Sequence, residues 1–146
     1  MKDTKRQTWM SLLAKADAGR VPELLGQAGP HPDFEWLRAP EIGSVMVQGR
    51  TGGTGAPFNL GEMTVTRCTL RLSSGEVGHA CLKGRRKGDA EAAAVVDALM
   101  QTSAAARMRS EVLGPLAEDA ARARHCRAAK AAATKVDFFT MVRGED

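Results

Sequence analysis

The amino-acid sequence predicts an α+β fold: N-terminal helices, a small antiparallel sheet of three or four strands, and C-terminal helices with an extended apolar tail. Two patterns support this prediction. Apolar residues recur at helical spacing near both ends of the chain, and β-branched residues alternate with polar ones in its middle. With 146 residues, the chain is long enough for a single domain over residues 1–146 with a buried core.

Two helices are predicted at the N-terminus. In the first, over residues 3–18, the large apolar side chains fall on one face, and Gly19 stops the run. Pro22 suits the first turn of a short second helix, which ends near Gly29. The apolar residues of these two helices are Trp9, Leu12, Leu13, Ala16, Leu24 and Leu25.

The segment PHPDFEWLRAPEIG, residues 30–43, contains too many prolines for a helix. We expect a connector there, with one extended piece around Trp36 and Leu37. The β-branched segment SVMVQGR, residues 44–50, is a strand candidate.

A hairpin is predicted from MTVTRCTLRL (residues 63–72) and EVGHACLKGR (residues 76–85), joined by SSG. A two-residue turn would place Cys68 opposite Cys81 and mix polar with apolar residues on both faces. A three-residue loop with Gly75 in the left-handed conformation shifts the register by one residue. We prefer this second register because it separates the two kinds of side chain: Cys68, Leu70, Leu72, Ala80 and Leu82 on one face, and Arg67, Thr69, Arg71, His79 and Cys81 on the other.

The C-terminal part is predicted to be helical. Asp89 can cap a helix whose apolar face consists of Ala92, Val95, Val96, Leu99 and Met100. A further helical region covers residues 104–135 and is interrupted near Pro115, which starts its second half. That half is rich in alanine but has few large apolar groups, so we expect the region of about 104–146 to pack on partners.

Composition narrows the classes of function. The formal charge is +4, acids and bases alternate through most of the chain, and only 4% of residues are aromatic. Nucleic acid is not expected as a partner, because such domains combine a basic stripe with stacking aromatics. No segment has the length of a membrane span, so no membrane contact is expected. Three cysteines without CxxC spacing suit reduced thiols and a cytoplasmic location.

The segment GRTGGTGAPFNLGEMTVTRC, residues 49–68, is rich in glycine and runs into an alternating strand. It lacks the GxxxxGK[ST] pattern of a P-loop and precedes a strand instead of a helix. Its backbone amides can still form an anion-binding concavity. The alternative is a loop shaped for close approach to another chain. The candidate substrate-binding residues of this loop are Arg50, Gly52, Gly53 and Thr54.

Arg67 and Arg71 lie on one face of the predicted hairpin and can form a fork for phosphonate or phosphate oxygens. The alternative is a face that is solvated or pairs with acids. The three histidines do not converge, and no nucleophile and base stand at a recognisable spacing. We therefore predict no catalytic residue and no metal site in this chain.

The segment VDFFTMVRG, residues 136–144, is unusually apolar for a chain terminus. Aromatic residues and methionine are enriched in interface cores, so the segment either docks on another chain or folds back over the alanine-rich helix. The candidate interface residues are Phe138, Phe139, Met141 and Arg143.

Four segments resemble the PhnG family, a subunit of the bacterial carbon–phosphorus lyase system. They are RQTWMSLLA, GRTGGTGAPFNLGEMTVTR, EAAAVVDALMQ and VDFFTMVRG, and they are spread over nearly all of the chain. One departure lies in GRRKG, where the family often carries an acidic residue and this chain has Arg86.

The resemblance implies a role in the first committed step of phosphonate breakdown. In that step an alkylphosphonate replaces adenine on ATP, which gives α-D-ribose 1-methylphosphonate 5-triphosphate. The resemblance also implies PhnH, PhnI and PhnJ as core partners, with PhnK and PhnL, of ATP-binding-cassette type, as further ones. MgATP is then a substrate of the complex, no cofactor is expected on this chain, and no catalytic residue carries over.

Two other functions stay open at this stage. A stand-alone anion- or nucleotide-binding protein would use the glycine-rich loop with Arg67 and Arg71. A purely structural assembly subunit would contact no ligand and would depend instead on Phe138 and Phe139.

Overall fold

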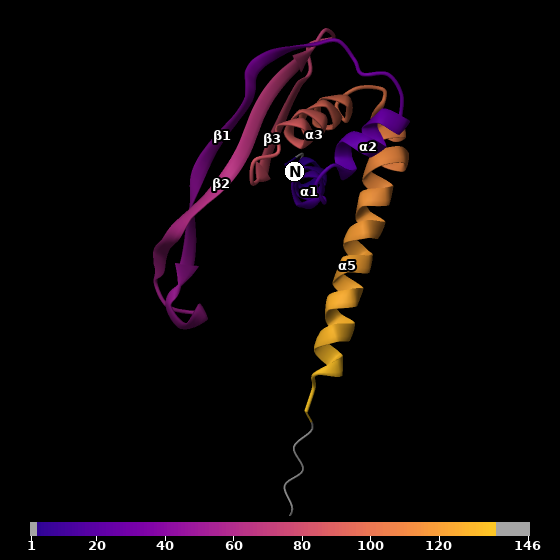
Figure 1. Ribbon diagram of the computed structural model, residues 1–146. Helices are drawn as coiled ribbons and strands as arrows, with labels where there is room; N and C mark the ends of the chain where they lie inside the picture. Colours follow the sequence, from indigo (N-terminus) through magenta and orange to yellow (C-terminus); the bar gives the residue numbers. More distant parts are fainter. Residues whose placement is uncertain (1–2, 137–146) are drawn as a thin grey trace, which may run out of the picture.

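A computed structural model describes residues 3–136. The described chain forms an antiparallel sheet of order β1-β2-β3 with helices on one side, from which α5 projects (Figure 1). This architecture confirms the predicted α+β fold, with three strands. The elements are α1 Asp3–Lys15, α2 Arg20–Gln27, β1 Phe34–Arg50, β2 Pro57–Leu72, β3 Val77–Lys83, α3 Lys87–Leu99, α4 Ala105–Met108 and α5 Gly114–Ala133.

The core lies between α3 and the sheet. Helix α3 packs on β2 and β3, α1 packs on α3 and β3, and α2 packs on α3. The alanines and valines of α3 allow a close approach, and Gly78 of β3 meets the helix backbone directly. A Cβ at Gly78 would lie 1.9 Å from the Ala94 carbonyl oxygen. The largest fully buried side chains include Leu70, Leu82, Val95, Val96 and Met108.

The β2–β3 hairpin has the predicted register. Cys68 faces Ala80 and Thr69 faces His79, as a three-residue loop requires. The Leu72 N–H donates to the Glu76 carbonyl at 2.9 Å, and Gly75 in the loop has a φ of 106°. The face assigned to the core is buried, as predicted: Cys68, Leu70, Leu72, Ala80 and Leu82.

The predicted connector over residues 30–43 is wrong for most of its length, because β1 begins at Phe34. The strand tolerates its proline since the pairing with β2 shifts register between Arg38 and Glu41, which flank Pro40. A proline at such an irregularity removes no ladder hydrogen bond. The predicted strand over residues 44–50 is the far half of this longer strand.

Strands β1 and β2 continue past α1, α2 and α3 as a two-stranded projection, which we call the arm and define as residues 42–64 (Figure 1). Residues 57–62 are exposed without alternation, so neither face of the tip is covered. Val47 pairs with Gly61 and Gln48 with Asn59, which leaves Leu60 as the extra residue of a bulge.

The C-terminal helical region is interrupted as predicted. A π-helical turn, Arg109–Leu113, separates α4 from α5, and Pro115 lies in the first turn of α5. The wider turn accommodates a proline ring that would otherwise clash with the carbonyl four residues earlier. Leu116 is buried, whereas every residue from Ala121 to Val136 is exposed. None of the described helices is long and apolar enough to cross a membrane.

Candidate functional site

The glycine-rich loop forms the tip of the arm. Thr51–Gly53 make one short helical turn, in which Gly52 and Gly53 have φ angles of 58° and 83°. Gly55 closes the loop by donating its N–H to the Thr51 carbonyl at 2.8 Å, and a Cβ there would lie 2.6 Å from that oxygen. The tightness of this turn explains the glycines, so their number alone does not argue for a phosphate cradle.

Arg50 places a positive charge at this tip. Its Nη1 donates to the Gly55 carbonyl at 3.1 Å, and its side chain is exposed. It is the only charged residue in the sequence between Ile42 and Gly61. Since one hydrogen bond leaves most of the guanidinium donors available, the tip can still bind an anion.

Arg67 and Arg71 are each paired with a carboxylate of β1. Arg67 Nε donates to Glu41 Oε1 at 2.7 Å, and Arg71 Nε donates to Glu35 Oε1 at 2.6 Å. The hydrogen bond from Arg67 lowers the pKa of Glu41. An anion can bind this arginine pair only by displacing the two acids.

The predicted substrate-binding residues fall into two separate groups. Arg50 pairs with Pro57 at the tip, whereas Arg67 pairs with Glu41 near the body. Ten residues of β2 separate these positions, roughly 30 Å at about 3.3 Å per residue. One small ligand on a single copy of the chain therefore cannot reach both the loop and the arginine pair.

In the described part of the chain, two hollows lie on the body, and neither includes the glycine-rich loop or Arg67. A cavity of about 240 Å³ lies between α1 and β3 and is lined mainly by apolar groups, together with His79 and Cys81. A second, more open hollow of about 480 Å³ includes Glu35 and Arg71 at the end of the sheet away from the arm. Arg71 is thus the one predicted substrate-binding residue that lines either hollow.

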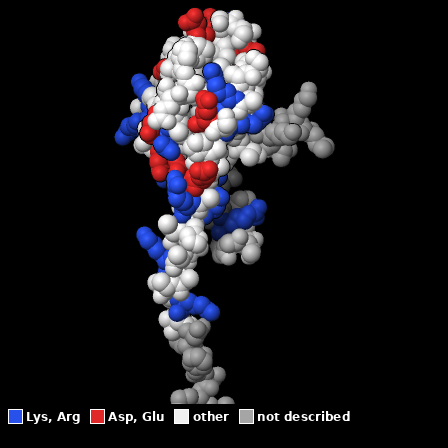
Figure 2. Space-filling model, turned by 90° about the vertical axis from the view of Figure 1, so that its right-hand side faces the viewer, with Lys and Arg blue, Asp and Glu red and all other residues white. Residues whose placement is uncertain are grey.

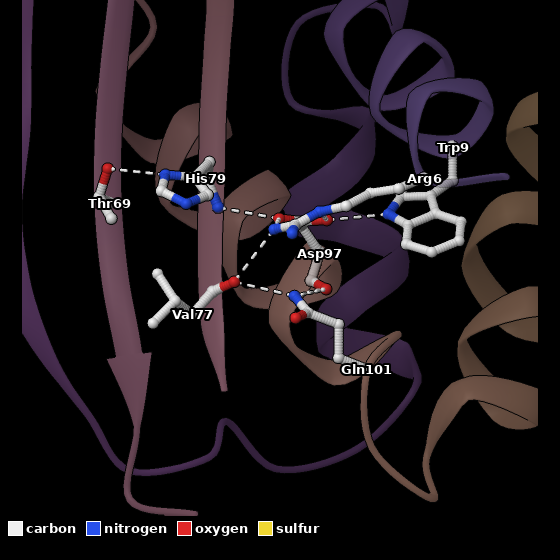
Figure 3. Close-up of polar contacts among 7 residues, drawn as sticks. All are labelled: Arg6, Trp9, Thr69, Val77, His79, Asp97 and Gln101. Atoms are coloured by element: carbon white, nitrogen blue, oxygen red, sulfur yellow. Dashed lines mark hydrogen bonds and ion pairs between the residues drawn. The ribbon is translucent and has the colours of Figure 1, made fainter. Parts of the chain in front are cut away.

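A buried carboxylate that the sequence reasoning missed organises the body (Figure 3). Asp97 of α3 is 0% exposed and accepts hydrogen bonds from Trp9 Nε1 at 2.9 Å and from the backbone N–H of His79 at 2.9 Å. Arg6 donates to the same carboxylate from Nε at 3.2 Å and from Nη2 at 2.7 Å. The carboxylate thereby joins α1, α3 and the edge strand β3.

Side chains around Asp97 also hydrogen-bond the backbone at the edge of β3. The Val77 carbonyl accepts from Arg6 Nη2 at 3.1 Å and from Gln101 Nε2 at 2.8 Å. The sequence signal for this cluster was an aspartate within the apolar run AAAVVDALM of α3. A buried charge in such a run needs partners, and RQTWM of α1 supplies them.

Two residues near the start of α3 hold the turn between α1 and α2. The predicted capping of α3 by Asp89 is wrong, because Arg86 occupies the N-cap position. The Asp89 carboxylate instead accepts the N–H of Gly19 at 2.8 Å. Arg86 donates to the Ala16 carbonyl at 3.0 Å, so the basic residue at this position serves a contact within the chain.

The other candidate groups stay apart. Within residues 3–136, no three His, Cys, Asp or Glu side chains gather in a metal-binding arrangement. His79 Nδ1 lies 3.1 Å from Thr69 Oγ1 on the outer face of the sheet. Cys68 is buried, and Cys81 and Cys126 are exposed free thiols. The candidate interface residues Phe138, Phe139, Met141 and Arg143 lie outside the described residues.

The geometry defines a small α+β domain with two projections: the arm, which carries four of the seven exposed large apolar side chains among the described residues, and α5, whose exposed end is rich in lysine and arginine. The profile of the family described as "Phosphonate metabolism protein PhnG" matches residues 4–144. The chain is also 49% identical over 143 residues to "Alpha-D-ribose 1-methylphosphonate 5-triphosphate synthase subunit PhnG" of Rhizobium meliloti (strain 1021), covering 97% of this chain and 91% of that protein. The chain therefore belongs to the PhnG family.

Proposed function

We propose that this chain is a subunit of an α-D-ribose 1-methylphosphonate 5-triphosphate synthase. The enzyme is a cytoplasmic, hetero-oligomeric transferase in which an alkylphosphonate displaces adenine from MgATP. Identity of 49% to a subunit of that name, over nearly the whole of both chains, supports the proposal. The proposed core partners are PhnH, PhnI and PhnJ, with PhnK and PhnL as further partners, and this chain holds no cofactor of its own.

The structural observation that carries the proposal is the arm. It extends past α1, α2 and α3 (Figure 1). Its terminal loop carries a single cation, Arg50. A projection of this kind suits a chain that completes a ligand pocket on another subunit. Phosphonate oxygens must be brought into line with the ribose C1′ while adenine departs, and a fixed guanidinium at the tip contributes to that alignment. Gly52, Gly53 and Thr54 shape the loop that presents it.

Arg67 and Arg71 belong to the proposed ligand-binding residues only if a ligand anion replaces their carboxylate partners. Their ion pairs are exposed, and exposed pairs contribute little stability, so such an exchange is physically accessible. The apolar residues Phe138, Phe139 and Met141, together with Arg143, are proposed to dock this chain on its partners.

The experiment is an omission assay with the other synthase subunits purified separately. Adenine release from MgATP in the presence of methylphosphonate is measured with and without this chain. The proposal predicts adenine release only when the chain is present. Equal turnover in its absence would contradict the proposal, and ATP binding by the isolated chain would favour a stand-alone nucleotide-binding protein.

A further inference from the structure

We infer that the arm and α5 together bind one partner protein. The surface of that partner is apolar where it contacts the arm and acidic where it contacts α5. This inference rests on the proposed role as a subunit of a larger enzyme. It adds to that role the surface used and the chemistry of the surface that fits it.

The arm exposes large apolar side chains, which a folded protein in water normally buries. Of the seven exposed large apolar residues among those described, four belong to the arm. Large exposed apolar side chains concentrated on one element mark interaction surfaces, and a two-stranded hairpin is at best marginally stable alone in water. These four residues and their exposed fractions are Ile42 45%, Met46 53%, Phe58 45% and Leu60 67%.

Part of this apolar surface faces the side on which α5 lies. Ile42 pairs with Thr66, which shares the helix-covered face of β2 with Cys68. Because side chains alternate along a strand, Met46 lies on the same face of β1 as Ile42. Helix α5 projects on that side of the sheet and in the same direction as the arm (Figure 1).

Helix α5 is the second projection, and it is positively charged. From Ala120 to Val136 the sequence holds five lysine and arginine residues and no acidic one. Figure 2 shows basic side chains without acidic neighbours along the lower, projecting part of the helix. Arg124, Arg127 and Lys130 form no ion pair within the part of the chain that the structure describes.

The arm and α5 together favour a protein as the partner over a nucleic acid. The arm carries only Arg50 and Glu62 as charged residues, so it offers a polyanion no binding surface along its length. The residues from Ala120 to Val136 include no Phe, Tyr or Trp side chain on which bases would stack. A protein surface with an acidic patch beside an apolar one complements both α5 and the arm.

The test measures the affinity of the full-length chain for the co-purified remaining subunits of the synthase, by biolayer interferometry at about 50 and about 500 mM NaCl. One variant reverses three charges on α5, and its control reverses three exposed charges on the body. A second variant makes the arm polar, and its control changes an exposed apolar residue outside the arm. The α5 variant is Arg124→Glu/Arg127→Glu/Lys130→Glu, and its control is Lys83→Glu/Arg85→Glu/Lys87→Glu. The arm variant is Met46→Ser/Leu60→Ser, and its control is Leu37→Ser.

We expect the α5 variant and the arm variant each to bind at least tenfold more weakly than wild type. The affinity of each control should stay within about twofold of wild type. The α5 variant should also lose the salt dependence of binding. All substituted side chains are exposed, and thermal unfolding checks that the variants remain folded. Wild-type affinity in both the α5 variant and the arm variant would overturn the inference and leave the proposed function standing.

Two further outcomes also overturn the inference. If the wild-type chain binds none of the synthase subunits, the proposed function fails with it. If the wild-type chain shifts a single-stranded RNA in a gel and the synthase subunits do not compete, the occupant is a nucleic acid.

Discussion

The Trp9 indole N–H donates a 2.9 Å hydrogen bond to the carboxylate of Asp97, which is completely buried in the body of the domain. The two residues lie 88 positions apart in the sequence. They belong to two of the segments that resemble the PhnG family, RQTWMSLLA and EAAAVVDALMQ. These segments therefore share a structural task, which is to fix α1 against α3 and the edge of β3.

Replacing Asp97 should destabilise the whole domain. Asp97→Ala removes the acceptor of the Trp9 indole N–H, of the His79 N–H and of two Arg6 hydrogen bonds, and a buried donor left unsatisfied costs about 1–3 kcal/mol. Urea denaturation followed by circular dichroism measures the free energy of unfolding. The control is Asp119→Ala, which removes a surface carboxylate paired with Arg20 and Arg122 and should change the stability little. Equal stabilities of the two variants would contradict this account of Asp97.

Gly78→Ala should be more disruptive than its size suggests. The added methyl group would lie 1.9 Å from the Ala94 carbonyl oxygen, so α3 would have to move away from β3. We expect the melting temperature to fall by at least several degrees, a loss of about 1–3 kcal/mol. Gly61→Ala is the matched strand control, because no heavy atom lies within 4 Å of its added Cβ. A melting temperature equal to that of the control would show that α3 adjusts freely.

Local turn chemistry was enough to predict the β2–β3 hairpin. The SSG loop and the alternation of two kinds of side chain allow one register that buries Cys68 with Ala80. The beginning of β1 was not predictable in this way, because its pairing with β2 joins residues far apart in sequence and passes Pro40 through a register shift.

The candidate site was predictable only in part. The sequence placed Arg67 and Arg71 on one exposed face, but not the acids Glu41 and Glu35 that the β1–β2 pairing sets beside them. Tertiary pairing also decides what Asp89 and Asp97 bind. Each carboxylate accepts hydrogen bonds from another element of the fold, and helix propensity says nothing about those partners.

The thiol of Cys68 should make stability fall at alkaline pH. Burial raises the pKa of this thiol from 9.0 to about 11, and its Sγ–H donates to the Ala90 carbonyl at 3.2 Å. Below pH 9 the thiol is protonated in both states and contributes no pH dependence. Between pH 9 and 11 it ionises in the unfolded chain but not in the folded one, so stability decreases as pH rises.

Denaturation curves between pH 8 and pH 11 test this prediction. Cys68→Ala should flatten the alkaline loss of stability relative to wild type, whereas Cys81→Ala, at an exposed thiol, should retain it. A wild-type slope in the Cys68 variant would assign the alkaline effect to other groups.

Arg50→Ala should lower phosphonate transfer without dissolving the assembly. The side chain is exposed at the tip of the arm and its one hydrogen bond lies within the loop, so its loss leaves the body intact. We expect adenine release in the reconstituted enzyme to fall by at least tenfold, with partial recovery in Arg50→Lys, which keeps the charge but loses the planar fork. An unchanged rate would remove Arg50 from the ligand-binding residues and favour a purely structural subunit.

The central claim is that this chain works as a subunit of a larger enzyme, and the mass of the co-expressed assembly tests it most directly. Multi-angle light scattering is applied to the chain alone and to the chain purified with PhnH, PhnI and PhnJ, for wild type and for Phe138→Ala/Phe139→Ala. We predict that the wild-type chain enters a stable complex of higher mass and that the double variant is lost from it. A wild-type chain that stays monomeric in the presence of all three proteins would contradict the account.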